Sequence, residues 1–600
     1  MGLNKKQKKY IRRNIKKKDI SEIALHLNIS EKEINLYFKK KIKGKEAVDN
    51  SGSLKGKILN FNFRKWFDKN ILILIGLTIL VFTAYINSLG NDFVSDDIAG
   101  IVQNQQLDKF AYTISGLPTT LRLFIDFLIV NIFGRSPVFF RLVNIFFHLG
   151  SVLVIFLLIN LMVNRTVALF AAAVLAVHPL QTEAVTWISG GLYSQYSFFI
   201  VLALLFYVLS VKDRKYYYFS IACFVLSLMS SEKAIVFPFL LFVYQLTFRQ
   251  LKNWKKLIVP FVIGGSWALF YVLKVPERIS SLETQHYQTP RMISPLFQVP
   301  VALGSYIELA FFPKGLTLYH SEMLFSRLEF AFKVLILLAV FGLIYYGFKR
   351  NRQLFFWPLF FIVSLFPVLT PFGISWIVAE RYVYLGAIGI FVTTGLLINL
   401  IFKKLKLKNA YYYAFLSFVI PVLLIRTIFR NNDWKNQDNL WLAAAKYSPS
   451  SAQNHNNLGD LYGRRGDLNR AAEEFKTAIQ LQPNYADAYH NLANTYSQLG
   501  ETDKAIQGYQ EAFKFNPNLW QSYQNLGGIY FNLKDFQKAE EYFKKALKLN
   551  YQSVQLHTFL TNTYLEQGKN SQAREELIIL LRFDPNNQEI QQALFNIPDN

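Results

Sequence analysis

Between residues 71 and 428 the chain carries one long apolar run after another, and this pattern limits its fold more than any other feature. A helix needs about 20 predominantly apolar residues to cross the hydrocarbon core of a bilayer. Only 18% of the 600 residues are charged and 52% are hydrophobic, whereas about 25% of the residues of a soluble domain are charged. The pattern excludes a single soluble domain, a disordered chain and a coiled coil. It predicts a polytopic helical membrane domain over residues 70–430.

We expect about 11 membrane spans in this domain. They are 71–89, 137–162, 166–186, 195–211, 216–230, 234–248, 257–274, 331–348, 354–370, 383–402 and 410–428. The apolar stretch 297–313 contains Pro300, Glu308 and Pro313, so we expect it to lie in or re-enter the outer face. Every connection on the side of the N-terminus is then rich in Lys and Arg, as cytoplasmic loops are. With an odd number of crossings, the C-terminus lies outside.

The N-terminal region, residues 1–69, is basic and is predicted to be cytoplasmic. Residues 1–70 hold roughly +13 of the formal net charge of +25. Two short amphipathic segments, residues 19–28 and 31–41, resemble a helix-turn-helix. In a polytopic protein such a basic segment is more often attracted to anionic lipid, so we expect no nucleic-acid partner. No apolar stretch begins before residue 71, so the segment is not predicted to be a signal peptide.

The C-terminal region, residues 431–600, repeats with a period of 34 residues, which is that of the tetratricopeptide repeat. The first copy carries Leu458, Gly459, Tyr462, Ala471, Phe475, Ala478 and Pro483, and the same pattern returns twice and then in a degraded copy. The predicted repeats are 450–483, 484–517, 518–551 and 552–585, and residues 437–448 are expected to form the second helix of a partial leading repeat. Such arrays form concave α-solenoids that bind peptides.

The loop after the first expected span ends in the pair Asp96 and Asp97. Adjacent carboxylates near a membrane boundary repel and desolvate each other, which raises the pKa of at least one of them. Such a carboxylate suits a general base acting on an acceptor hydroxyl. A solvated loop, or a helix N-cap formed by Asp96, is the alternative interpretation.

Further ionisable side chains fall at the outer ends of the expected spans, where charge is costly and often functional. They are His178, Glu183, Glu232, Lys233, His320, Glu380 and Arg381, with Tyr382 beside them. Arg381 suits fork-like contact with a phosphate, and Lys233 suits contact as a point charge. Alternatively, each cation pairs with the glutamate next to it in sequence. His178 and Glu183 could instead form a hydrogen-bonded pair that caps the third span.

Two further patterns bear on chemistry. Arg141, Asn144 and His148 lie one helical turn apart on one stripe of the second span, where they could line a cavity or pack between helices. Cys223 is the one cysteine, so neither an intrachain disulfide nor a cysteine-based zinc site can form. Near His178 there is no His-x-x-x-His or His-x-x-Glu motif, so no metal site is indicated. The sequence indicates no other cofactor.

In their order along the chain, several segments resemble the membrane O-mannosyltransferases that carry C-terminal tetratricopeptide repeats, and their bacterial relatives. The segments are Phe93-Val94-Ser95-Asp96-Asp97, Arg141-Leu142-Val143-Asn144 with His148, His178-Pro179 with Thr182-Glu183-Ala184-Val185, Glu380-Arg381-Tyr382-Val383-Tyr384-Leu385 and Asn432-Asp433-Trp434-Lys435. The resemblance covers about residues 71–600. The chain departs from the family at Ser230-Ser231-Glu232, where the family commonly has Ser-Lys-Glu. Its lysine here, Lys233, lies two positions after the place of the family's lysine.

The resemblance implies an all-α, GT-C-like glycosyltransferase whose donor is a sugar linked to a polyprenyl phosphate. An aspartate of the first outer loop would act as the base, which points to Asp96 or Asp97, with Asp96 slightly preferred by analogy with the Asp-Glu pair of related enzymes. Arg381 and Lys233, with Glu380 and Tyr382, would bind the donor phosphate. His178, Glu183, Glu232 and His320 would complete the outer-face site. Relatives differ in whether they need a divalent metal.

The implied reaction is an inverting displacement that moves mannose or a similar hexose to a hydroxyl, and the expected acceptor is a protein held by the repeats. Two alternatives remain open. A non-enzymatic scaffold that recruits envelope proteins would have a sealed, apolar outer face around Asp96. A transporter would have inverted repeats and charges near mid-membrane. The expected location is the bacterial inner membrane, with the N-terminus cytoplasmic and the repeats extracytoplasmic.

Overall fold

The computed structural model describes residues 7, 20–27, 29–31, 54–115, 119–248, 253–284, 294–318, 320, 326–369 and 377–597. These residues form helices and no strands, which confirms the predicted all-α class. In the N-terminal region, α2 (Ile20–Leu27) matches the first helix of the expected helix-turn-helix. The second helix of that prediction, residues 31–41, lies outside the described residues except for Glu31.

Each of the 11 expected spans corresponds to a helix. The helices are α5 (Phe63–Tyr85), α8 (Pro137–Met162), α9 (Arg165–Val177), α11 (Gly191–Leu209), α12 (Lys215–Leu228), α13 (Phe237–Thr247), α14 (Lys255–Thr284), α16 (Arg327–Arg350), α17 (Arg352–Ser364), α18 (Tyr384–Lys404) and α19 (Asn409–Asp433). Among the described residues, 7 helices are long and apolar enough to cross a membrane, or up to 8 if a bent pair counts as one span. The helices α12, α13 and α17 are shorter, with 14, 11 and 13 residues.

The third span is broken, although residues 166–186 were expected to form one helix. The chain bends by 55° between α9 and the segment formed by the 3-10 turn η4 (Pro179–Gln181) and α10 (Thr182–Val185). Pro179 lacks a backbone N–H and pushes the residue before it out of the helical region. His178 accordingly has an extended backbone, with φ −77° and ψ 126°.

The first long helix of the membrane domain begins earlier than the expected span. The helix α5 begins at Phe63 rather than near residue 71, because Asn62 caps it by accepting a hydrogen bond from the backbone N–H of Lys65. A short helix, α4 (Leu54–Leu59), precedes it within the expected linker. A hydropathy criterion starts a span at its first apolar residue, whereas the helix extends through the charged turns before it.

The segment between the first two spans holds structure that the sequence reading did not predict. It contains the π-helical turn η2 (Ile98–Val102), the 3-10 turn η3 (Gln105–Asp108), α6 (Phe110–Ser115) and α7 (Thr120–Phe133). With 14 residues, α7 is about 21 Å long, too short to be recognised as a span.

The helix α15 (Pro295–Phe311) corresponds to the apolar stretch that was expected not to cross. Near its start, the ring of Phe297 stacks on Phe330 in the first turn of α16, with centroids 5.7 Å apart. Near its end, the carbonyl of Ala310 lies 3.0 Å from Nε2 of His178 at the end of α9. Both ends of α15 therefore contact helix ends on the same face of the domain.

The repeat region folds as the 34-residue period predicts. The helix pairs are α21 (Ala452–Arg464) with α22 (Leu468–Leu481), α23 (Ala486–Gln498) with α24 (Thr502–Phe515), α25 (Trp520–Asn532) with α26 (Phe536–Leu549), and α27 (Val554–Glu566) with α28 (Asn570–Phe583). The helix α20 (Gln437–Tyr447) precedes them and α29 (Gln588–Asn596) follows. A Cβ at Gly459 would lie 2.6 Å from the ring of Phe475, so a small residue is needed where the two helices of a repeat cross.

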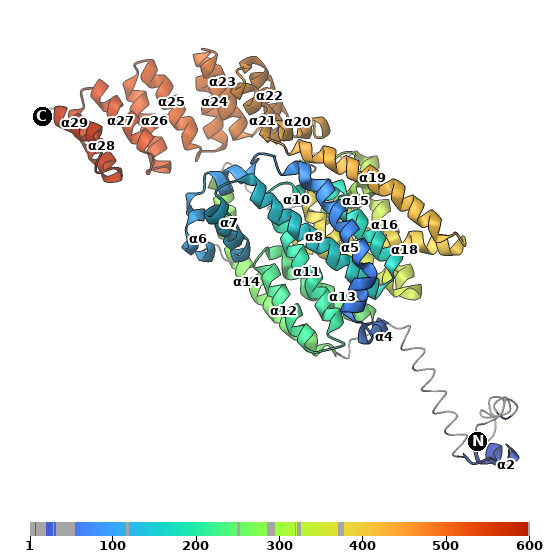
Figure 1. Ribbon diagram of the computed structural model, residues 1–600. Coiled ribbons are helices and arrows are strands. Elements are labelled where there is room, and N and C mark those ends of the chain that lie inside the picture. The colour runs from blue at the N-terminus through green and yellow to red at the C-terminus, as the bar shows by residue number, and fades with distance from the viewer. Residues whose placement is uncertain are drawn as a thin grey trace.

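The solenoid, orange to red in Figure 1, extends from the end of the membrane domain where α10 lies, and α4 lies at the opposite end. In the membrane domain, α9 is almost entirely buried between α5, α8, α18 and α19. Its run of alanines lets these neighbours approach closely. The face from which the solenoid extends is called the site face below.

Candidate active site

An acidic loop, residues 91–97, follows α5 on the site face. Ser95 has a left-handed backbone, with φ 54°, a conformation that is uncommon for a residue with a side chain. After this turn the two aspartates lie in different surroundings: Asp96 is exposed and Asp97 is fully buried. Asp96 can therefore meet a substrate from solvent, whereas Asp97 holds the loop in place.

The Asp97 carboxylate ties the acidic loop to the segment between α10 and α11. It accepts hydrogen bonds from the backbone N–H of Ser189 at 2.8 Å, from the hydroxyl of the same serine, and from the backbone N–H of Val94 at 3.3 Å. Burial raises the pKa of Asp97 to about 6, although these hydrogen bonds and Arg141 oppose the rise. The cause of the shift is therefore burial, and not repulsion by the adjacent Asp96.

The stripe on α8 packs between helices. The Arg141 guanidinium is fully buried and donates to the carbonyls of Asn91 and Asp92 in the acidic loop, and to that of Thr186 at 3.0 Å. His148 shares a hydrogen bond of 2.6 Å with the hydroxyl of Tyr384. These side chains lock the acidic loop and α18 onto α8.

Asn144, the third member of the stripe, lies against Gly191 at the start of α11. Its amide nitrogen lies 3.2 Å from the carbonyl of Trp187, and its oxygen accepts from Arg122 at 3.0 Å. A Cβ at Gly191 would lie 1.8 Å from the Asn144 side-chain oxygen. A glycine is therefore required at position 191, because the backbone of α11 lies too close to the Asn144 side chain to leave room for a Cβ.

We expect Gly191→Ala to lower the free energy of unfolding by about 1–3 kcal/mol, because overpacking displaces the Asn144 amide from its carbonyl partners. Thermal unfolding in detergent would measure the change. The matched control is Gly76→Ala in α5, where a Cβ would meet nothing within 4 Å. Equal melting temperatures for the two variants would contradict the packing described for Gly191.

Arg381 pairs with a glutamate distant in sequence rather than with Glu380. Its guanidinium and its backbone N–H both bind Glu183 of α10, the latter at 2.9 Å. The guanidinium also lies over the rings of Trp187 and Tyr382, 5.2 and 5.0 Å from their centroids. The alternative interpretation, a pair between Arg381 and the adjacent Glu380, is therefore wrong, because the 55° bend after α9 brings Glu183 to the arginine.

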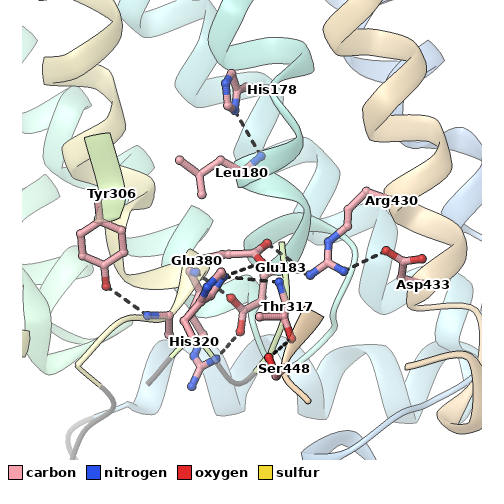
Figure 2. Close-up of polar contacts among 12 residues, drawn as sticks. His178, Leu180, Glu183, Tyr306, Thr317, His320, Glu380, Arg430, Asp433 and Ser448 are labelled. Carbon is pink, nitrogen blue, oxygen red and sulfur yellow. Dashed lines mark hydrogen bonds and ion pairs between the residues drawn. The ribbon is translucent and has the colours of Figure 1, made fainter. Parts of the chain in front are cut away.

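Glu380 instead joins a second buried network, drawn in Figure 2. Both of its oxygens accept from Arg430 of α19, at 3.1 and 3.3 Å, and one lies 3.2 Å from Nε2 of His320. Arg430 also pairs with Asp433 at 2.8 Å. Thr317, three residues before His320, shares a hydrogen bond of 2.9 Å with Ser448 after α20. The network links α19, the segment before α18 and the first helix of the repeat region.

The polar contacts of His178 are with backbone groups and not with Glu183 or Glu380. Its Nδ1 accepts from the backbone N–H of Leu180 at 3.2 Å (Figure 2), and its Nε2 bonds the carbonyl of Ala310. The pair of His178 with Glu183 that was considered as an alternative does not form, because the chain turns between them. His178 thus fixes the bend after α9 against α15.

Lys233, in the 3-10 turn η5 (Glu232–Val236), forms an ion pair with the adjacent Glu232, which was the alternative to phosphate contact. Its ammonium lies 2.6 Å from Glu232 and 5.3 Å from the ring centroid of Tyr193. Tyr193 in turn contacts Tyr382, with centroids 5.7 Å apart. Lys233 and Arg381 therefore flank one aromatic pair.

The repeat region is anchored directly on the acidic loop. The backbone N–H of Asp92 donates to the carbonyl of Lys435 at 2.8 Å. The rings of Trp187 and Trp434 stack with centroids 5.5 Å apart. The acidic loop, the Glu183–Arg381 pair and the base of the solenoid therefore share the site face.

Sequence reasoning missed several of these side chains. Ser189, Trp187 and Arg122 carry no motif and become recognisable only through their partners. Arg430 did give a signal, since an arginine at the end of an apolar span is rare and often functional.

Three comparisons place the chain among known proteins. A family model described as TPR repeat matches residues 459–500, and one described as tetratricopeptide repeat matches 486–519 and 520–550. Among solved structures, a crystal structure of MamA protein aligns with 27% of this chain and 88% of its own, at 22% identity and a TM-score of 0.23. The family models confirm the predicted repeats.

The curated relatives share one activity in their names. Protein O-mannosyl-transferase F38B6.6 of Caenorhabditis elegans is 27% identical over 452 residues, which cover 69% of this chain and 63% of the relative. Protein O-mannosyl-transferase TMTC3 of Homo sapiens is 25% identical over 482 residues, which cover 68% of this chain and 51% of the relative. The chain thus spans about half to two thirds of the length of these two relatives, and the resemblance predicted from the motifs is confirmed.

Proposed function

We propose that this chain, which resembles the protein O-mannosyl-transferases, is a membrane glycosyltransferase. It moves mannose or a similar hexose from a polyprenyl-phosphate-linked donor to a hydroxyl of a protein acceptor. One observation carries the proposal: the exposed Asp96, the two largely covered cations Arg381 and Lys233, and the repeat solenoid are joined on one face of a polytopic domain. A scaffold with no enzymatic role was expected to have a sealed, apolar outer face around Asp96, whereas Asp96 is exposed.

The reaction is an inverting single displacement. The Asp96 carboxylate takes the proton of the acceptor hydroxyl, and the oxygen attacks the anomeric carbon of the sugar. The bond from that carbon to the phosphate oxygen breaks, and the lipid phosphate leaves with the electron pair. Phosphate is already a good leaving group, so no general acid is needed. Asp97 positions the acidic loop through Ser189 and Val94.

The donor phosphate binds beside Arg381 and Lys233. A guanidinium has five N–H donors, so its pairing with Glu183 leaves donors for a second anion. The aromatic pair between the two cations, Tyr193 and Tyr382, is buried, which strengthens charge interactions there. Fixed cations of this kind stabilise the charge that develops on the leaving phosphate.

The site face is extracytoplasmic in this proposal, and the membrane is the bacterial inner membrane. The support is the charge of the opposite face, where the last turn of α16 carries Lys349 and Arg350 and that of α18 carries Lys403 and Lys404. Connections of this kind remain in the cytoplasm. A protein acceptor would then reach the acidic loop from the repeats on the same side.

The proposal is tested by reconstituting the full chain in vesicles with polyprenyl-phosphate mannose, radiolabelled in the sugar, and a membrane-protein acceptor fraction. Label in the protein fraction that depends on both the donor and the chain is the expected result. Its absence at saturating donor, with correctly folded protein, would contradict the proposed activity.

The hydroxyl of Ser189 is expected to set the acid limb of the pH profile. Its hydrogen bond lowers the pKa of Asp97, and the ionised form keeps the acidic loop in place, so activity should rise as pH increases through about 6. Removing the hydroxyl in Ser189→Ala raises this pKa further and moves the limb to higher pH by about one unit. Ser189→Thr, which keeps a hydroxyl, is the control. Profiles of kcat/KM that coincide for all three proteins would exclude this role.

A further inference from the structure

The helices α6 and α7 pack against each other beside the acidic loop, and the polarity of α7 is reversed relative to that of a soluble amphipathic helix. Its two charged residues, Arg122 and Asp126, are 8% and 7% exposed and face the protein. Phe124, Leu128 and Ile132 on the other side are 38%, 38% and 64% exposed. A helix at a water-exposed surface buries its apolar face and turns its charges outward.

The inward face of α7 is bound to the protein through Arg122. Nε of Arg122 lies 3.2 Å from a carboxylate oxygen of Asp126. The other guanidinium nitrogens donate to the side-chain oxygen of Asn144 at 3.0 Å and to the carbonyl of Ile188 at 3.2 Å. The charges of α7 therefore serve internal contacts, which leaves the apolar side as its outer surface.

The outward face is apolar over both helices. Phe110 of α6 contacts Phe124 and Phe127, with ring centroids 6.3 and 5.8 Å away, and Ile114 is 57% exposed. Asn131 is the polar residue among them, and its amide donates to the carbonyl of Phe127 in its own helix at 2.9 Å. Satisfying a polar group within its own helix is what a hydrocarbon environment requires.

This apolar surface continues onto a membrane span. Phe133, at the end of α7, stacks on Phe139 in the first turn of α8, with centroids 4.0 Å apart. Further along α8, Phe146 is 56% exposed on the outside of the domain. The outward side of the two helices and the lipid-facing side of a span thus form one surface.

The position of α7 prevents it from crossing. Its length of about 21 Å is short of the hydrocarbon thickness of about 30 Å. The backbone N–H of Leu121 donates to the carbonyl of Met229 at the end of α12. Just past the other end of α7, Arg135 donates to the carbonyls of Ile101 and Asn104. Both ends are therefore held at the site face.

We propose that α6 and α7 are embedded in the leaflet at the site face, with the acyl chains of bilayer lipids against Phe110, Ile114, Phe124, Leu128 and Ile132. Arg122 and Asn144 hold the chain just before Ser189, the residue that binds Asp97. Lipid contact by α7 therefore fixes the depth of the acidic loop at the level of the lipid headgroups. This inference rests on burial and packing and does not depend on the proposed function.

The test is site-directed spin labelling of the full chain in phosphatidylcholine–phosphatidylglycerol vesicles. In a Cys223→Ala background, single nitroxides are placed at Leu128→Cys and Ile132→Cys. Gln106→Cys in η3, an exposed position, gives the aqueous reference. Leu338→Cys in α16, 59% exposed, gives the membrane reference. Power saturation then compares collisions with oxygen, which partitions into lipid, and with the water-soluble reagent NiEDDA.

The labels on α7 should collide with oxygen several-fold more often than the label at residue 106, and should be shielded from NiEDDA. Their depth should fall between the two references. Access to NiEDDA equal to that at residue 106 would show a surface in water. Low access to both reagents would show a surface covered by protein. Either of these results would overturn the proposal, and neither would bear on sugar transfer.

Discussion

The Asp96→Asn variant is expected to transfer sugar about 10²–10⁴-fold more slowly than the unmodified chain, the loss typical of a missing general base. Asparagine has nearly the same size as aspartate but cannot take the acceptor proton. The side chain is exposed at the acidic loop, so the substitution should leave folding intact. The fall should therefore appear in the rate of transfer and not in the melting temperature.

The measurement is the initial rate of label transfer from polyprenyl-phosphate mannose, with thermal unfolding of the same samples. The matched control is Asp92→Asn, an exposed carboxylate of the same loop, which should keep close to the full rate. Asp97→Asn should lose both stability and activity, because its carboxylate holds the loop. An Asp96→Asn variant with the full rate would remove the base assigned here.

Replacing Arg381 with methionine is expected to lower the free energy of unfolding by about 3–5 kcal/mol, because Glu183 is left as a buried charge without its partner. The Glu183 side chain is 1% exposed and that of Arg381 11%. The control is Lys545→Met in the solenoid, whose partner Glu541 is 57% exposed. An exposed pair of this kind contributes about 0–1 kcal/mol.

The double variant Glu183→Gln with Arg381→Met separates structure from phosphate binding. It removes both charges, so most of the lost stability should return. The rate of transfer should stay low, because the cation beside the donor phosphate is still missing. If stability and rate both recovered, Arg381 would be a structural residue and would not bind the donor.

The sequence predicted the architecture well, because its signals are local. An apolar run of span length marks a membrane helix wherever its neighbours lie, and small and aromatic residues 34 positions apart mark each repeat. The features that were not predicted also have a physical reason. Pro179 was visible, but the 55° bend depends on how His178 packs against α15. The helix α7 is too short for a span criterion and has its charges on the inside.

The partners of the candidate site residues could not be predicted from the sequence. Adjacent acids cannot be told apart in sequence, and it is the left-handed turn at Ser95 that exposes Asp96 and buries Asp97. For Arg381 the alternative to phosphate contact was a pair with the adjacent Glu380, but it pairs with Glu183, nearly 200 positions earlier. Ser189 gave no signal at all. Contacts between distant segments depend on the packing of several helices, which a single sequence does not display.

The structure of the Asp96→Asn variant with polyprenyl-phosphate mannose bound tests the central claim most directly, because a variant that binds but cannot react keeps the donor in place. The account predicts density for the phosphate beside Lys233 and Arg381, with the anomeric carbon of the sugar turned toward residue 96 and the base of the solenoid on the same side. Donor density at the opposite face, or none at saturating donor, would contradict it.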